Sequence, residues 1–196
     1  DPNKTIFTDL QVLEFLDNTE KSDSIEKDLE SAFDLFNLYA STYQERYDTQ
    51  LNFLNLIQEE NLKDTGKLRR DLSDAERLNN QKELRDLWVD LSTNDVIQLM
   101  LSGNTLEESV SKTKKRMSNQ LNYFSQTRNE DVFNIFVNSI AAVYGPHTAY
   151  MSPKNSEDFD INMSLSLEGI GALLSSDGLY TSISSLVPGG PAEKTD

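Results

Sequence analysis

The chain has 196 residues, with 18 Lys and Arg against 33 Asp and Glu, so its formal net charge is −15. Its apolar fraction is 37%, low beside the roughly 45–50% of globular domains, which counts glycine as well. The acid excess argues against nucleic acid and anionic lipid as partners, because both are bound through Lys and Arg. The absence of cysteine excludes disulfides, thiolate metal sites and cysteine nucleophiles.

The start of the chain carries no targeting pattern. No run approaches the ~18 consecutive apolar residues of a membrane span, and no signal-peptide pattern opens the sequence. The chain begins at Asp1 without an initiator Met. We therefore expect it to be an internal piece of a longer protein.

Residues 1–150 are predicted to form an array of about five or six helices, because apolar residues recur there at spacings of three and four. The first well-marked helix covers about 24–60, with Asp23 and Ser24 as candidate N-caps. It is expected to stop near Gly66. Its apolar stripe consists of Ile25, Leu29, Phe33, Phe36, Ala40, Tyr43, Tyr47, Leu51 and Leu54.

Two further helices follow. One begins near Leu84 and is ended by Gly103-Asn104, and the next begins at Thr105, which forms a predicted capping box with Glu108. The short basic run 114–116 on this helix has two interpretations. It is either a nucleic-acid patch or, as we favour, a complement to the negative end of the helix dipole.

The last predicted helix covers 132–143 and is stopped by Gly145-Pro146. His147, the single histidine, lies just beyond it. Its neighbours offer no metal ligands, and the sequence contains no nucleophile elbow. We therefore predict a turn role for His147, and no metal site.

The composition changes after Gly145-Pro146 and Ser152-Pro153, where helix breakers cluster. Residues 151–163 are predicted to be a linker and a first strand, with apolar and polar residues alternating over 161–167. Asp177-Gly178 is typical of a hairpin turn between two further strands. The run 188–191 predicts a turn, with Pro191 as the first residue of a short helix.

A glycine-x-glycine sequence at residues 169–171 precedes an apolar strand. Such a turn leaves successive backbone amides able to face one anion, and the terminal carboxylate of a peptide can bind there. The strand that follows can add the peptide as a further strand. A plain tight turn is the alternative interpretation, because the motif by itself is weak.

Several stretches of the chain have the pattern of one protein family. They are Leu84, Leu87 and Trp88, then 129–133, 146–148, 152–153, 163–172 and 189–192. With these stretches the chain resembles the tail-specific, or C-terminal processing, proteases of Gram-negative bacteria. The resemblance is close over residues 80–196 and looser over 1–79. Gly145 departs from it, since the family usually has Asp at that position.

The resemblance implies a periplasmic serine endopeptidase that recognises substrates by their C-terminal tails through a PDZ domain. Cleavage in this family uses a Ser–Lys dyad. Nothing in residues 1–196 matches that dyad, so no catalytic residue is expected in this chain. No cofactor is implied. The implied partners are the tails of protein substrates, the downstream PDZ and protease domains of the parent chain, and a lipoprotein adaptor built of helical repeats.

By motif alignment, the carboxylate loop would be Gly169, Ile170, Gly171 and Ala172, and Leu173 and Leu174 would begin the peptide-pairing strand. The expected domains are a helical N-terminal domain at 1–150, a linker at 151–163 and an incomplete PDZ domain at 164–196. The alternative function is a non-enzymatic helical scaffold or adaptor that presents a tail-binding edge.

Overall fold

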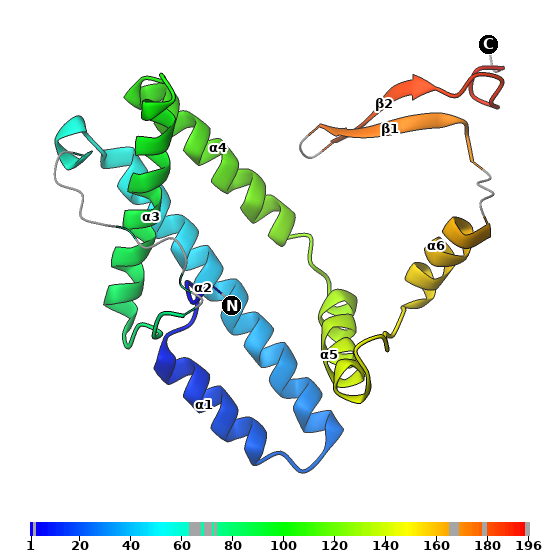
Figure 1. Cartoon of the computed structure of the whole chain (residues 1–196), viewed down its shortest axis with the longest axis horizontal. Helices are drawn as coiled ribbons and strands as arrows, with labels where there is room; N and C mark the ends of the chain where they lie inside the picture. Colours follow the sequence, from blue (N-terminus) through cyan, green and yellow to red (C-terminus); the bar gives the residue numbers. More distant parts are fainter. Residues whose placement is uncertain are drawn as a thin grey trace. The chain divides into compact units, whose positions relative to one another are not determined.

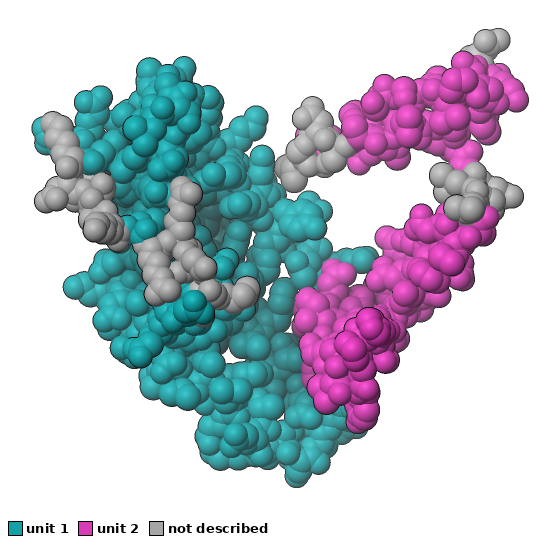
Figure 2. All heavy atoms as spheres, in the orientation of Figure 1, with its two compact units in different colours: residues 1–128 teal, residues 129–196 magenta. Residues whose placement is uncertain are grey.

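The computed structural model describes residues 1, 3–62, 68, 72, 74–164, 169–177 and 180–194. The chain forms two compact units, Asp1–Arg128 and Asn129–Asp196 (Figure 2). The architecture is mainly helical with one two-stranded antiparallel sheet near the C-terminus (Figure 1). The expected fold class is therefore confirmed. The expected domain boundaries stay a prediction.

In its described residues, the first unit contains four α-helices and a short 3-10 helix. Each α-helix begins at a polar N-cap whose side chain accepts a backbone amide of the first turn. These N-caps are Thr8, Ser24, Asn80 and Thr105. The elements are α1 (Asp9–Glu20), α2 (Ile25–Leu56), η1 (Glu59–Leu62), α3 (Gln81–Leu101) and α4 (Leu106–Phe124).

The predicted starts agree closely with the structure. Ser24 caps α2, and Thr105 and Glu108 form both hydrogen bonds of the capping box of α4. The long helix is continuous but ends at Leu56, and η1 follows it. The stop expected near Gly66 lies outside the described residues. The sequence pattern did not single out α1, whose leucines are largely exposed.

The core of the first unit lies where α2, α3 and α4 meet. One buried residue from each helix forms its centre, namely Leu54, Val96 and Met117. The partly buried side chains around them include Tyr47, Phe53, Met100, Leu106 and Val110. The apolar stripe predicted for the long helix therefore reaches this core through Tyr47 and Leu54.

Hydroxyl side chains fill several buried positions of this core. Ser92, Ser109 and Thr113 are each at most 1% exposed. Their hydroxyls donate to carbonyls of their own helices, at 3.1 Å to Trp88, 2.8 Å to Thr105 and 2.8 Å to Ser109. Because a satisfied hydroxyl costs little to bury, small polar residues can bring helices close together. This explains how a compact unit forms from a chain with few apolar residues.

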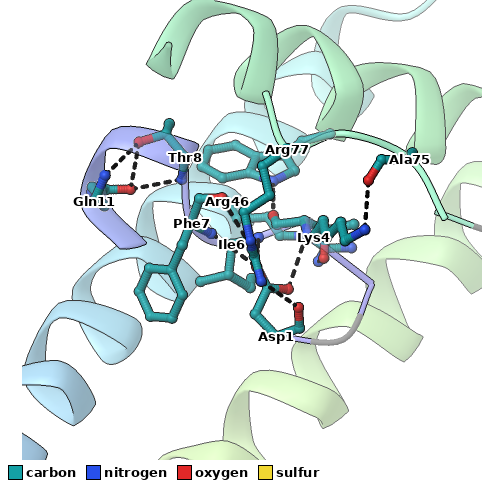
Figure 3. A network of polar contacts seen from close by, with 11 residues as sticks. Asp1, Lys4, Ile6, Phe7, Thr8, Gln11, Arg46, Ala75 and Arg77 are labelled. Carbon is teal, nitrogen blue, oxygen red and sulfur yellow. Dashed lines mark hydrogen bonds and ion pairs between the residues drawn. The ribbon is translucent and has the colours of Figure 1, made fainter. Parts of the chain in front are cut away.

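The N-terminal segment joins the helices of this unit (Figure 3). The Asp1 carboxylate accepts the amides of Thr5, Ile6 and Phe7 at 3.0–3.2 Å and pairs with the Arg77 guanidinium at 2.9 Å. Ile6 and Phe7 are buried, and the Phe7 ring contacts the Tyr39 ring of α2 edge-on at 5.9 Å.

Trp88 of α3 connects the same segment to the core. Its side chain is fully buried, and the indole N–H donates to the carbonyl of Thr5 at 2.6 Å. Gln50 of α2 donates to the Trp88 carbonyl at 3.1 Å and to the Ser92 hydroxyl at 2.8 Å. One aromatic residue thus holds α2, α3 and the N-terminal segment together.

The basic run 114–116 does not complement a helix terminus. It lies in the middle of α4, and no basic residue occupies the last turn of that helix. Lys114 instead donates to Asn55 of α2 at 2.7 Å, and Arg116 pairs with Asp95 of α3. The favoured dipole interpretation is wrong, because these side chains reach across to neighbouring helices.

The second unit begins with α5 (Asn129–Tyr144), as predicted. The amide of Thr148 donates to the carbonyl of Gly145 at 3.0 Å, so His147 lies in a turn, also as predicted. Asn138 of α5 exchanges hydrogen bonds with the backbone of Tyr150 at 2.7 and 3.1 Å. The chain after the turn therefore folds back along α5.

The strand predicted from Ile161 is wrong for residues 161–164, because α6 (Pro153–Ser164) extends through them. Ser152 starts this helix: its hydroxyl accepts the Asn155 amide at 3.3 Å, and its carbonyl accepts the Ser156 amide at 2.8 Å. Ser followed by Pro is an N-cap and first-turn pair as well as a break. Residues 165–167 of the predicted strand lie outside the described residues.

The two later strands are present. They are β1 (Ala172–Asp177) and β2 (Tyr180–Leu186), which pair antiparallel as the hairpin prediction requires. The predicted turn residue Gly178 lies outside the described residues. The helix expected at Pro191 is a single turn, with the Lys194 amide donating to the Pro191 carbonyl at 3.1 Å.

Removal of the α4 cap should destabilise the first unit. Thr105→Ala should lower the free energy of unfolding by about 1 kcal/mol, measured by urea denaturation. Ser111→Ala, an exposed hydroxyl deletion on the same helix, should change it by less than about 0.5 kcal/mol. Equal effects of the two variants would contradict a capping role.

The capping box also makes a pH-dependent contribution. The hydrogen bonds that the Thr105 backbone and side chain form with Glu108 lower the pKa of its carboxyl. When folding lowers the pKa of a carboxyl group, its ionised form stabilises the folded state at pH values above the pKa in the unfolded state. This stabilisation is lost as the pH falls through the pKa in the folded state. The stability difference between wild type and Glu108→Gln should therefore shrink on acidification, as followed by urea denaturation at several pH values.

Trp88→Phe should destabilise the protein by about 1–3 kcal/mol, because the buried carbonyl of Thr5 loses its donor. Thermal unfolding followed by circular dichroism measures this. Tyr144→Phe removes an aromatic donor at a site that is 85% exposed and should leave the melting temperature nearly unchanged. A Trp88→Phe protein as stable as wild type would contradict the anchoring role.

Candidate functional site

The glycine loop at residues 169–171 has a backbone that only glycine adopts easily at its last position. Gly171 has φ of +75°, in the left-handed region that penalises a Cβ. A Cβ at this position would also lie 3.0 Å from Pro191 Cδ and 3.1 Å from Gly190 Cα. At Gly169, by contrast, an added Cβ meets nothing within 4 Å. The two glycines of the motif therefore have different roles.

The loop is fastened through its carbonyl groups. The Gly171 carbonyl accepts the Val187 amide at 2.7 Å, and the Ile170 carbonyl accepts the Ala192 amide at 2.8 Å. The turn that supplies these donors is closed by a hydrogen bond of 2.9 Å from the Gly190 amide to the Val187 carbonyl. Residues 187–192 thus hold the loop against the end of β2.

The amides of the loop are differently engaged. Within the described ranges, the N–H groups of Ile170 and Gly171 donate to no protein acceptor. Successive N–H groups around a left-handed residue form a concave donor site that suits an anion. The Glu193 carboxylate is already bound to a neighbouring amide, since it accepts a hydrogen bond from Gly189 N–H at 2.5 Å.

The strand that leaves the loop has one paired edge. β1 pairs with β2 from Ala172 opposite Leu186 to Asp177 opposite Tyr180, with a bulge between Leu173 and Leu174. The sheet has two strands in the part of the chain that the structure describes. Along those residues the other edge of β1 keeps its backbone donors and acceptors available for an added strand.

The predicted site residues therefore lie together on one continuous segment. Gly169, Ile170 and Gly171 form the loop, and Ala172, Leu173 and Leu174 begin β1. The apolar side chains at 170, 173 and 174 are 59–63% exposed, more than expected for strand residues with a buried face. Large exposed apolar groups beside an unpaired strand edge are typical of a binding surface.

Sequence reasoning missed the support that residues 187–192 give to the loop. At 189–190 the sequence pattern predicts only a turn before a helix. In the structure, Gly190 and Pro191 contact Gly171 directly. The signal was the absence of a side chain at both 171 and 190, which allows two backbone segments to approach closely.

Other chemistry is not apparent in the described residues. No group of three or more His, Asp or Glu side chains among them is arranged to hold a metal ion. Likewise, no helix in the described ranges has both the length and the apolarity of a membrane-spanning segment. The groups that the loop and β1 offer are backbone N–H and C=O groups and exposed apolar side chains.

Comparison with known proteins identifies the family. The family model described as the tail specific protease N-terminal domain matches residues 1–154. The tail-specific protease of Haemophilus influenzae is 34% identical over 168 residues, which are 86% of this chain and 24% of that protein. The chain thus spans about a quarter of the length of this curated relative. Together these matches place the chain in the tail-specific protease family, with the N-terminal domain of that family at residues 1–154.

Proposed function

We propose that the chain is the N-terminal part of a periplasmic C-terminal processing protease, and that residues 169–174 recognise the C-terminal tails of its substrates. The family match supports a protease as the parent protein. The observation that carries the tail-binding role is the junction of the glycine loop with β1, where available amides lead directly into an unpaired strand edge.

The recognition would use two kinds of contact. The terminal carboxylate of the substrate would accept hydrogen bonds from the amides of the loop, and the preceding residues would pair with β1 as an added strand. The exposed side chains of Ile170, Leu173 and Leu174 favour tails that end in apolar residues. Peptide recognition by strand addition gains affinity from the backbone and selectivity from side-chain pockets.

Peptide-bond cleavage would be performed by a Ser–Lys dyad in a part of the parent protein beyond these residues. In such a dyad the lysine is the general base that activates the serine, so neither histidine nor a cofactor is required. This chain alone should then have no peptidase activity. Docking to a lipoprotein adaptor of helical repeats is a second proposed role for the helical domain.

A free carboxylate on the tail should be required for binding. A fluorescent peptide with an apolar C-terminus should bind the full-length protease about tenfold or more tightly than its C-terminal amide, because hydrogen bonds to a charged group are the strong ones. Fluorescence anisotropy measures both affinities. Equal affinities would remove the carboxylate loop from the proposal, and a full-length gene without a protease domain would favour the scaffold alternative.

The two glycines of the loop provide a matched test. Gly171→Ala should weaken tail binding about tenfold or more, because the Cβ strains a positive φ and crowds Pro191. Gly169→Ala makes the same chemical change in open space and should bind the tail nearly as wild type does. Similar losses in both variants, or none in either, would contradict the assigned loop geometry.

A further inference from the structure

A second concave surface lies within the first unit, between α2 and α4. It is an open cleft of about 810 Å³, within the size range of roughly 300–1,000 Å³ usual for ligand sites. The sequence pattern predicts that Tyr43 and Tyr47 belong to an apolar stripe and that the run 114–116 complements a helix end. Neither interpretation accounts for a cleft, because the two walls come from segments about seventy residues apart.

The charge of this cleft opposes that of the chain. Four cationic side chains line it, Arg46 from α2 and Lys112, Lys115 and Arg116 from α4. Among the described residues, no Asp or Glu lines it, although the chain has 33 of them. In a protein of net charge −15, such a local excess of cations favours the binding of acidic ligands at this surface.

Among the described residues, one of these four cations forms an ion pair. Arg116 pairs with Asp95, but Lys112 is bonded to the neutral amide of Asn104. Arg46 donates to Gln50 and Thr5, both at 3.3 Å. Within the described ranges, neither Arg46 nor Lys115 has a carboxylate within 4.0 Å.

Arg46 is a half-buried residue of the cleft lining. Burial lowers the pKa of its guanidinium, an effect that Tyr43, Tyr39 and Asp95 oppose. A cation in such partly desolvated surroundings interacts with an anion more strongly than one at the open surface does. Its planar donor group also suits the two oxygens of a carboxylate.

The other component of the cleft is aromatic. Phe124 of α4 contacts the Tyr43 and Tyr39 rings of α2, with centroids 4.9 and 5.4 Å apart. Tyr123, next to it, is 81% exposed and also lines the cleft. Rings beside cations suit a ligand that combines acidic groups with apolar side chains.

We propose that the cleft between α2 and α4 binds an acidic segment of a partner protein, with carboxylates facing Arg46 and Lys115 and an aromatic or aliphatic side chain against the tyrosines. A polypeptide fits because the cleft is open and each of its two helices supplies both cationic and aromatic side chains. The cleft would bind the side-chain carboxylates of Asp and Glu and not a terminal carboxylate, so this proposal is independent of the tail-binding role proposed above.

The probe is a fluorescent peptide of mixed Glu and Asp with two Phe residues, blocked at both ends so that it has no terminal carboxylate. Fluorescence anisotropy should show binding to the 196-residue chain that weakens as salt increases. The peptide with Gln and Asn in place of its acids should bind at least about tenfold more weakly. Equal binding of the two peptides, or tighter binding of single-stranded RNA, would overturn the proposal.

Charge reversal at the cleft provides the matched variants. Lys112→Glu with Lys115→Glu should weaken acidic-peptide binding about tenfold or more, since each reversal replaces attraction by repulsion. Lys82→Glu with Lys154→Glu makes the same net change at exposed sites outside the cleft and should alter affinity less than about threefold through long-range charge alone. Similar losses in both double variants would contradict the site, and circular dichroism checks that each variant is folded.

Discussion

The hydrogen bond from the Trp88 indole to the Thr5 carbonyl is the interaction on which the first unit depends most. It fixes an irregular segment against the fully buried side chain of Trp88 in α3, so the segment cannot leave without exposing that side chain. The Asp1 carboxylate then closes this segment upon itself and attaches it to Arg77 (Figure 3). A short stretch of chain therefore substitutes for part of an apolar core.

The same helical unit also carries the cleft proposed as a binding site. Buried hydrogen bonds of Gln50 hold α2 to α3, and α4 packs on this pair through Leu106, Val110 and Met117. α2 and α4 also line the open cleft. In the second unit, the edge of β1 is the other proposed binding surface. The chain thus offers two surfaces of different chemistry, one cationic and one built of backbone amides.

The sequence predicted those features that depend on neighbouring residues. The capping box of Thr105, the N-cap at Ser24 and the hairpin of β1 and β2 each follow from local chemistry, and all are present. The error at α6 has a local cause too, because Ser152-Pro153 can start a helix as well as end one. The support of Gly171 by Pro191 and the α2–α4 cleft could not be predicted, since each joins segments that only tertiary packing brings together.

The hydroxyl and amide groups buried between the helices have a thermodynamic consequence. When the unit unfolds, these groups are exposed together with the apolar side chains, and polar exposure lowers the heat capacity change that apolar exposure raises. The temperature dependence of stability is governed by that heat capacity change. Ser92, Ser109, Thr113 and Gln50 should therefore give this domain a broader, flatter stability curve than an aliphatic core of equal size would give.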